Sequence, residues 1–100
     1  MRLGTTPQHT FTFPFETDII QELKITYSQN KKIILEKYLS DCEVDKNSVS
    51  YQLTQEETFL FADGVNVEVQ ARVLTVGGDA LASDIRIVTA ERCLDREVIK

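Results

Sequence analysis

The stretch from residue 65 to residue 89 constrains the fold of this chain more than any other. Apolar and polar side chains alternate through its first half, where the apolar set is Val65, Val67, Val69, Ala71 and Val73. A period of two is typical of a β-strand with one face in a core and the other in water. A pair of glycines at 77–78 then precedes a second apolar run. The stretch therefore predicts two long antiparallel strands joined by a glycine turn.

The same alternation predicts how these two strands pair. A two-residue loop at 77–78 would place Ala71 opposite Asp84 and bury a carboxylate against the valine face. A three-residue loop at 77–79, or any odd-length loop or single bulge with the same effect, avoids this cost. We therefore expect the odd-length register, whose pairs are Ala71 with Ile85, Val69 with Ile87 and, on the outer face, Arg72 with Asp84.

Shorter alternating stretches predict the other strands, at residues 10–15, 23–28, 33–39 and 48–53. Pro14 has no amide proton to donate, so the first of these is expected at the edge of a sheet or to end there. In the third, Ile33, Leu35 and Leu39 make the better buried set, with Lys37 near the exit of the strand and its ammonium in water.

Thr54 and Glu57 have the spacing of a capping box, which predicts about one turn of helix. The pair at 63–64, Asp-Gly, then forms the turn into the long strand. Residues 1–8 contain a glycine and a proline ahead of the first apolar pattern and are expected to be a flexible leader. Residues 9–100 form a single domain, within which residues 91–100 fit a final strand and a short helix equally and stay open.

Six or seven short strands at near-regular spacing, with no helix long enough to connect parallel strands, favour an all-β fold. We expect an antiparallel, immunoglobulin-like β-sandwich of about seven strands with one short helical turn, and a small β-barrel is the alternative. The chain has no tryptophan and so lacks the Cys-Trp-Cys hallmark of antibody domains. The comparison with immunoglobulins therefore concerns architecture alone.

Size and charge limit the function classes. A chain of 100 residues fits one domain with a sizeable core. A net charge of −5 opposes contact with phosphate backbones, so we expect no nucleic-acid partner. The apolar runs fall far short of the roughly 20 residues that cross a bilayer and no signal peptide is recognisable, so we expect no membrane partner and a cytoplasmic product. Cys42 and Cys93 fit two small, partly buried thiols better than a structural disulfide.

We expect no catalytic, cofactor-binding or metal site, and no enzymatic activity. The only histidine, His9, is expected at the surface or at a strand edge. Glu56 and Glu57 are adjacent, but neighbouring residues of a helical turn point in different directions and Glu57 is already used as a cap. Two pairs of aspartates would hold calcium only if loops brought them together, and solvated turns explain them better: Asp79 with Asp84, and Asp41 with Asp45.

Most aromatic side chains fall at inward strand positions, which predicts core packing. Tyr38 is the one aromatic residue expected to point outward. The strand at 10–15 is expected at a sheet edge, where unpaired backbone groups offer a partner a place to bind. We therefore predict Phe11, Phe13, Phe15 and Tyr38 as interaction residues.

Three stretches carry a family resemblance: TTPQHTFTFPF at 5–15, LTQEET at 53–58 and RVLTVGGDALASDI at 72–85. Together they resemble a family of small, uncharacterised proteins encoded in prophages and phages of Gram-positive gut bacteria, usually near tail, baseplate or fibre genes. The resemblance covers nearly the whole chain and is weaker over residues 28–47. It implies a role in the virion or in its assembly, and it assigns no residue to a function.

The expected function is that of a non-enzymatic phage structural or assembly protein, a tail- or baseplate-associated module that acts by protein–protein contact. The implied partners are other phage structural proteins or further copies of the chain itself. Such a product is made in the cytoplasm of the bacterial host and then built into the virion. The alternative is a carbohydrate-binding or adhesin-like module that recognises a cell surface through its loops.

Overall fold

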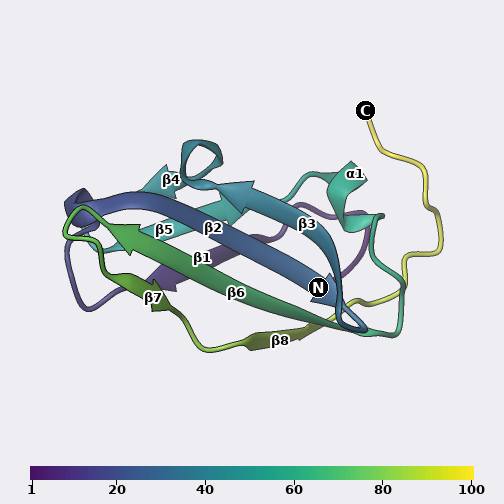
Figure 1. The fold of residues 1–100 in the computed structure, drawn as a ribbon. Helices are drawn as coiled ribbons and strands as arrows, with labels where there is room; N and C mark the ends of the chain where they lie inside the picture. Colours follow the sequence, from purple (N-terminus) through teal and green to yellow (C-terminus); the bar gives the residue numbers. More distant parts are fainter.

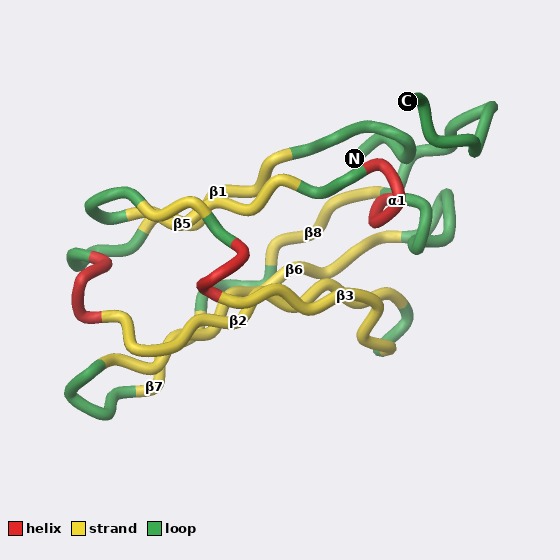
Figure 2. Tube along the Cα trace, turned by 90° about the horizontal axis from the view of Figure 1, so that it is seen from above, coloured by secondary structure: helices red, strands yellow, loops and turns green.

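Two antiparallel β-sheets lie face to face in the computed structural model, which describes residues 1–100 (Figure 1, Figure 2). The smaller sheet has the order β1 (Gln8–Thr12), β5 (Ser48–Gln52), β4 (Glu43–Val44). The larger has the order β3 (Lys32–Tyr38), β2 (Ile20–Gln29), β6 (Asn66–Thr75), β7 (Ala80–Ala82), and β8 (Arg86–Thr89) also pairs with β6. The expected all-β antiparallel sandwich is therefore confirmed.

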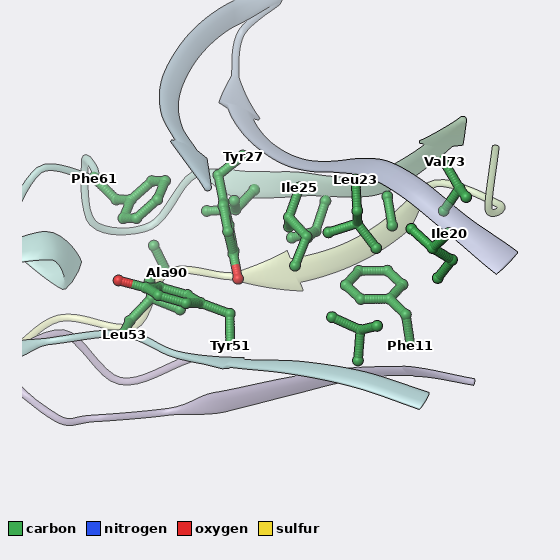
Figure 3. Packing of buried hydrophobic residues seen from close by; sticks show 14 of the residues in the cluster. Phe11, Ile20, Leu23, Ile25, Tyr27, Tyr51, Leu53, Phe61, Val73 and Ala90 are labelled. Carbon is green, nitrogen blue, oxygen red and sulfur yellow. The ribbon is translucent and has the colours of Figure 1, made fainter. Parts of the chain in front are cut away.

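The core lies between the two sheets and is built by the alternation of β2, β5 and β6. Leu23, Ile25 and Tyr27 of β2 stand opposite Val73, Ala71 and Val69 of β6, and all six are buried. Val49 and Tyr51 of β5 close the core from the smaller sheet. Figure 3 shows Tyr51 on this side of the core. Burying an aliphatic or aromatic side chain contributes about 1.5–3 kcal/mol, so this inward set stabilises the sandwich.

The single α-helical turn, α1 (Gln55–Thr58), forms where the capping box predicted it. The Glu57 N–H donates to Thr54 Oγ1 at 3.1 Å, and the Thr54 N–H donates to Glu57 Oε1 at 2.9 Å. Two 3-10 turns, η1 (Thr17–Ile19) and η2 (Leu39–Asp41), complete the regular structure. The turn before β6 is also confirmed, since Gly64 has a φ of 74°.

The predicted register of the 65–89 hairpin is wrong. Its loop is residues 76–78, an odd length as expected but one residue earlier, so Val73 lies opposite Leu81. Ser83 then forms two hydrogen bonds to one residue of β6: its N–H donates to Ala71 O at 2.8 Å, and its Oγ accepts from the Ala71 N–H at 3.0 Å. This contact shifts the pairing by one residue before β8 begins.

The shift exchanges the faces of the residues that follow Ser83. Arg86 lies opposite Val69 and Val88 opposite Val67, whereas Ile85 and Ile87 are 53% and 64% exposed. The expected pairs Ala71–Ile85, Val69–Ile87 and Arg72–Asp84 therefore do not form, and Arg72 pairs with Ala82. The second strand of the hairpin is also not continuous but is divided into β7 and β8.

The predicted inward set of the third strand is wrong at Ile33. Asn30 and Lys31 form a two-residue turn with positive φ angles of 52° and 64°, and the β2–β3 pairing then shifts between Tyr27 and Ser28. This bulge turns Ile33 to the exposed face, while Leu35 and Leu39 remain packed on the core as predicted. Lys37 lies opposite Ile25 and therefore points between the sheets instead of into water.

The chain ends are packed together. Leu3 is fully buried, and the Leu3 N–H donates to Glu91 O at 3.0 Å. Arg2 and Glu91 form an isolated parallel β-bridge. The expectation that residues 1–8 form a flexible leader overlooked this contact, because Leu3 has no local pattern that announces its burial. Residues 91–100, left open by the sequence, contain neither a strand nor a helix.

Candidate functional site

A groove opens on one side of the sandwich, between the end of β1 and the β7–β8 connection. Residues 11–15 line one wall, residues 81–86 line the other, and the buried Ala71 and Val73 of β6 lie between them. The groove encloses about 590 Å³ and most of its lining is apolar. It therefore gives access to the core between the two sheets.

The sequence explains why the groove stays open. Pro14 has no N–H, so β1 ends at Thr12 and the chain leaves the sheet. On the opposite wall, the two bonds of Ser83 to Ala71 end β7 and push residues 83–85 out of the ladder. Neither wall continues as a strand at this point, so no ladder closes the two sheets here.

The four predicted interaction residues lie in different environments. Phe11 is a core residue, only 3% exposed, so its assignment as a surface contact is wrong. Its side chain packs with Ile20, Leu23 and Val73 (Figure 3). The error arose because a strand at the edge of a sheet still has one face directed at the core.

Phe13 and Phe15 do lie along the groove and are partly buried. Their rings stack with centroids 5.2 Å apart and an interplanar angle of 22°. Tyr38 is exposed as predicted, but it lies on β3 of the other sheet and lines a separate hollow with Lys24 and Arg72. The predicted residues therefore do not form one surface.

Arg86 is a groove residue that sequence reasoning missed. Its guanidinium carbon lies 4.5 Å from the centroid of the Phe11 ring, and its Nη2 donates to Thr10 O at 3.0 Å. The side chain therefore links β8 of one sheet to β1 of the other. The sequence did not indicate this role for Arg86, because the expected register placed its side chain on the outer face.

A cluster of charged and polar side chains joins the two sheets at a point away from the groove. Glu57 Oε2 pairs with Lys37 Nζ at 2.7 Å, and Glu57 Oε1 accepts from the Tyr51 hydroxyl at 2.6 Å. Burial alone would raise the pKa of Glu57, but hydrogen bonds from Lys37, Tyr51 and the Thr54 amide outweigh it and lower this pKa. The hydrogen bond to Glu57 likewise raises the pKa of Lys37. Both groups therefore stay charged at neutral pH and hold β3, β5 and α1 together.

His9 is the third polar group between the sheets. Its Nδ1 shares a hydrogen bond of 2.8 Å with the Tyr27 hydroxyl, and the two rings lie 5.5 Å apart. Burial, and then the positive charges of Arg86 and of the chain's amino group, lower the pKa of His9. Burial also raises the pKa of Tyr27. The pair is therefore neutral at pH 7.

Acidification should destabilise the protein through His9. Because its pKa in the folded chain is lowered from 6.5, the unfolded chain binds this proton more readily, and the free energy of unfolding falls as the pH drops through 6.5. One proton limits the slope to about 1.4 kcal/mol per pH unit. Urea denaturation between about pH 7 and about pH 5 should give a flatter profile for His9→Gln than for the wild type. Equal slopes for the two chains would disprove this role of His9.

Glu57 and the two cysteines are engaged in hydrogen bonds within the chain. No group of three or more His, Cys, Asp or Glu side chains is arranged to hold a metal ion. Cys42 and Cys93 are free and partly buried, as expected, and burial raises the pKa of Cys42. Glu57 has its oxygens occupied by Lys37, Tyr51 and Thr54. The apolar groove is a candidate binding site.

No protein-family model, curated protein or solved structure matches the chain. None of its helices has the length and apolar character needed to span a membrane.

Proposed function

We propose that this protein is a non-enzymatic phage structural or assembly component, associated with the tail or baseplate, that works by protein–protein contact through the groove. The observation that carries the proposal is the pair of stacked, partly buried phenylalanines, Phe13 and Phe15, beside an opening onto the core. Aromatic side chains around an open apolar surface are typical of protein contact sites. The phage context comes from the resemblance of residues 5–15, 53–58 and 72–85 to phage-encoded proteins.

The wall at 81–86 supports a protein partner over a small ligand. Ile85 is half exposed there, and Arg86 is already used to link the two sheets. An open groove with mostly apolar walls suits an extended segment of polypeptide, which can bury several side chains at once. In this function the sandwich is a rigid frame that holds the two walls apart.

Mass spectrometry of purified particles tests the phage role. We expect peptides of this chain in particles, or in tail assembly intermediates, induced from the bacterium that encodes it. Their abundance should be similar to that of other structural components. Absence from both the particles and the intermediates would contradict the proposal.

A second candidate function, recognition of carbohydrate, rests on Tyr38. Its ring is exposed beside a hollow that Lys24 and Arg72 also line, and an exposed ring with polar neighbours can stack on a sugar. Lys24 Nζ lies 5.8 Å from the ring centroid and covers part of this surface. A glycan array that yields no ligand, or ligands that Tyr38→Ala still binds, would eliminate this candidate.

A further inference from the structure

We infer that the groove receives residues 94–98 of a second copy of this chain, so that copies associate head to tail. The inference rests on the proposed function, because it names the partner of the same groove. Its grounds are the exposure of residues 94–100, their place at the opposite end of the molecule, and the match between their pattern and the groove.

Residues 94–100, called the arm below, carry two strongly exposed apolar side chains, Leu94 and Ile99, while Val98 is partly buried. Leu94 is 89% exposed and Ile99 is 78% exposed. The arm is held at the surface by a few contacts: the Gln55 amide exchanges two hydrogen bonds of 2.9 Å with the backbone of Ile99. Arg96 donates to Phe59 O at 3.0 Å, and its guanidinium carbon lies 5.0 Å from the centroid of the Phe59 ring. Few buried contacts mean a low cost of release, so the arm can leave its own chain.

The arm and the groove lie at opposite ends of the molecule. The arm runs beside α1, which lies at the other end of the molecule from β7 and from the last residue of β1 (Figure 1, Figure 2). The groove is lined by residues of those two distant segments. Seven extended residues reach at most about 25 Å, and the long axis of the molecule measures 46 Å. The arm therefore cannot reach the groove of its own chain, and an arm that binds there belongs to a neighbouring copy. Contacts of this heterologous kind produce rings or filaments.

The free edge of β1 offers backbone partners to such an arm. The Phe13 N–H donates to Asn47 O and the Leu53 N–H donates to Pro7 O, so β1 bonds to β5 through its odd-numbered residues. The backbone groups of Thr12 consequently point to the free edge, and Thr12 lines the groove. An extended arm can add to this edge as a strand.

The side chains of the arm match the wall of the groove. In an extended arm, Leu94, Arg96 and Val98 share one face. The wall likewise carries an acidic residue, Asp84, between two aliphatic ones, Leu81 and Ile85. Its other charged residue, Arg86, is engaged by the Phe11 ring and by Thr10 O. Docking would place the guanidinium of Arg96 by the Asp84 carboxylate, with aliphatic contacts on both sides. Ile99 falls on the other face of the arm and stays outside.

Light scattering of the full chain over about a hundredfold range of concentration tests the contact. We expect the mass of the wild type to rise with concentration. Leu94→Glu and Ile85→Glu should each lower the association constant about tenfold or more, while the matched controls Ile99→Glu and Ile87→Glu leave it unchanged. All four residues are at least half exposed, so the variants should fold. Asp84→Arg should weaken association, and Arg96→Asp in the same chain should restore it.

A labelled peptide of residues 92–100 gives a second readout. It should bind saturably to the Leu94→Glu chain, whose groove is intact, and not to the Leu94→Glu, Ile85→Glu chain. A wild type that stays monomeric and leaves the peptide unbound overturns the head-to-tail contact, while the phage role is decided separately by the particle experiment. If Ile85→Glu weakened association and Leu94→Glu did not, the groove would still be a contact site, but the arm would not be its occupant.

Discussion

Phe11→Ala is expected to lower the free energy of unfolding by about 3–5 kcal/mol. The ring is 3% exposed and packs between the sheets, and Arg86 stacks on it with its guanidinium 4.5 Å from the ring centroid. Truncation leaves a cavity at the point where the Arg86 side chain, and not a ladder of backbone hydrogen bonds, links the two sheets. Because small domains are stable by only about 5–15 kcal/mol, the change removes a large share of the total. Denaturant titration followed by circular dichroism measures it.

Phe13→Ala is the matched control for this result. Phe13 is two residues away on the same face of the chain, yet it lies partly exposed along the groove. We expect it to cost only about 1–2 kcal/mol. If the two variants lost equal stability, the assignment of Phe11 to the core and of Phe13 to the groove would be contradicted.

Glu57→Ala is expected to cost about 3 kcal/mol at neutral pH. The carboxylate accepts the Tyr51 hydroxyl and the Thr54 amide and pairs with Lys37, all at 2.9 Å or less. Its removal leaves the half-buried Lys37 without its carboxylate partner and takes away the cap of α1. Since its folded pKa is lowered, its stabilising effect is present above pH 4.5 and is lost as the pH falls below that value.

Glu56→Ala provides the comparison, because Glu56 is adjacent, exposed and outside this cluster. Its effect should stay within about 0.5 kcal/mol. The measurement is the difference in urea midpoint between each variant and the wild type. A Glu57→Ala chain as stable as Glu56→Ala would show that the cluster does not join the sheets.

Local patterns in the sequence were sufficient to predict the centre of the fold. The alternation of β2, β5 and β6 identified their buried faces because each of these strands packs one full face on the core. The capping box likewise predicted α1, since its hydrogen bonds run within four residues. What failed depended on contacts between distant residues, such as Leu3 with Glu91.

The register error shows the same limit. Whether the chain shifts at Ser83 depends on its side chain bonding the Ala71 amide, and nothing in the alternation announces this bond. At Ile33, the length of the turn decided which face the residue occupies. In the first case a hydrogen bond between residues 12 apart in the chain, and in the second a tight turn, outweighed the preference of an isoleucine for the core.

The candidate site could be predicted only in part. Phe13 and Phe15 were recognised, but Phe11 was assigned to the surface and Arg86 to the wrong face. The signal for Lys37 was visible, because it interrupted an otherwise apolar face between Leu35 and Leu39. Such an interruption is the mark of a charge with a partner, and that partner, Glu57, lies on a distant segment.

Incorporation of variants into particles tests most directly whether this protein acts by contact through its groove. The gene would be replaced by one that encodes Ile85→Glu or, as the control, Ile87→Glu. Ile87 is two residues further along the chain and is also exposed, but it does not line the groove. We predict that particles from the Ile85→Glu strain lack the chain or lose infectivity, while Ile87→Glu particles match the wild type. Equal incorporation and equal infectivity of both variants would contradict the account.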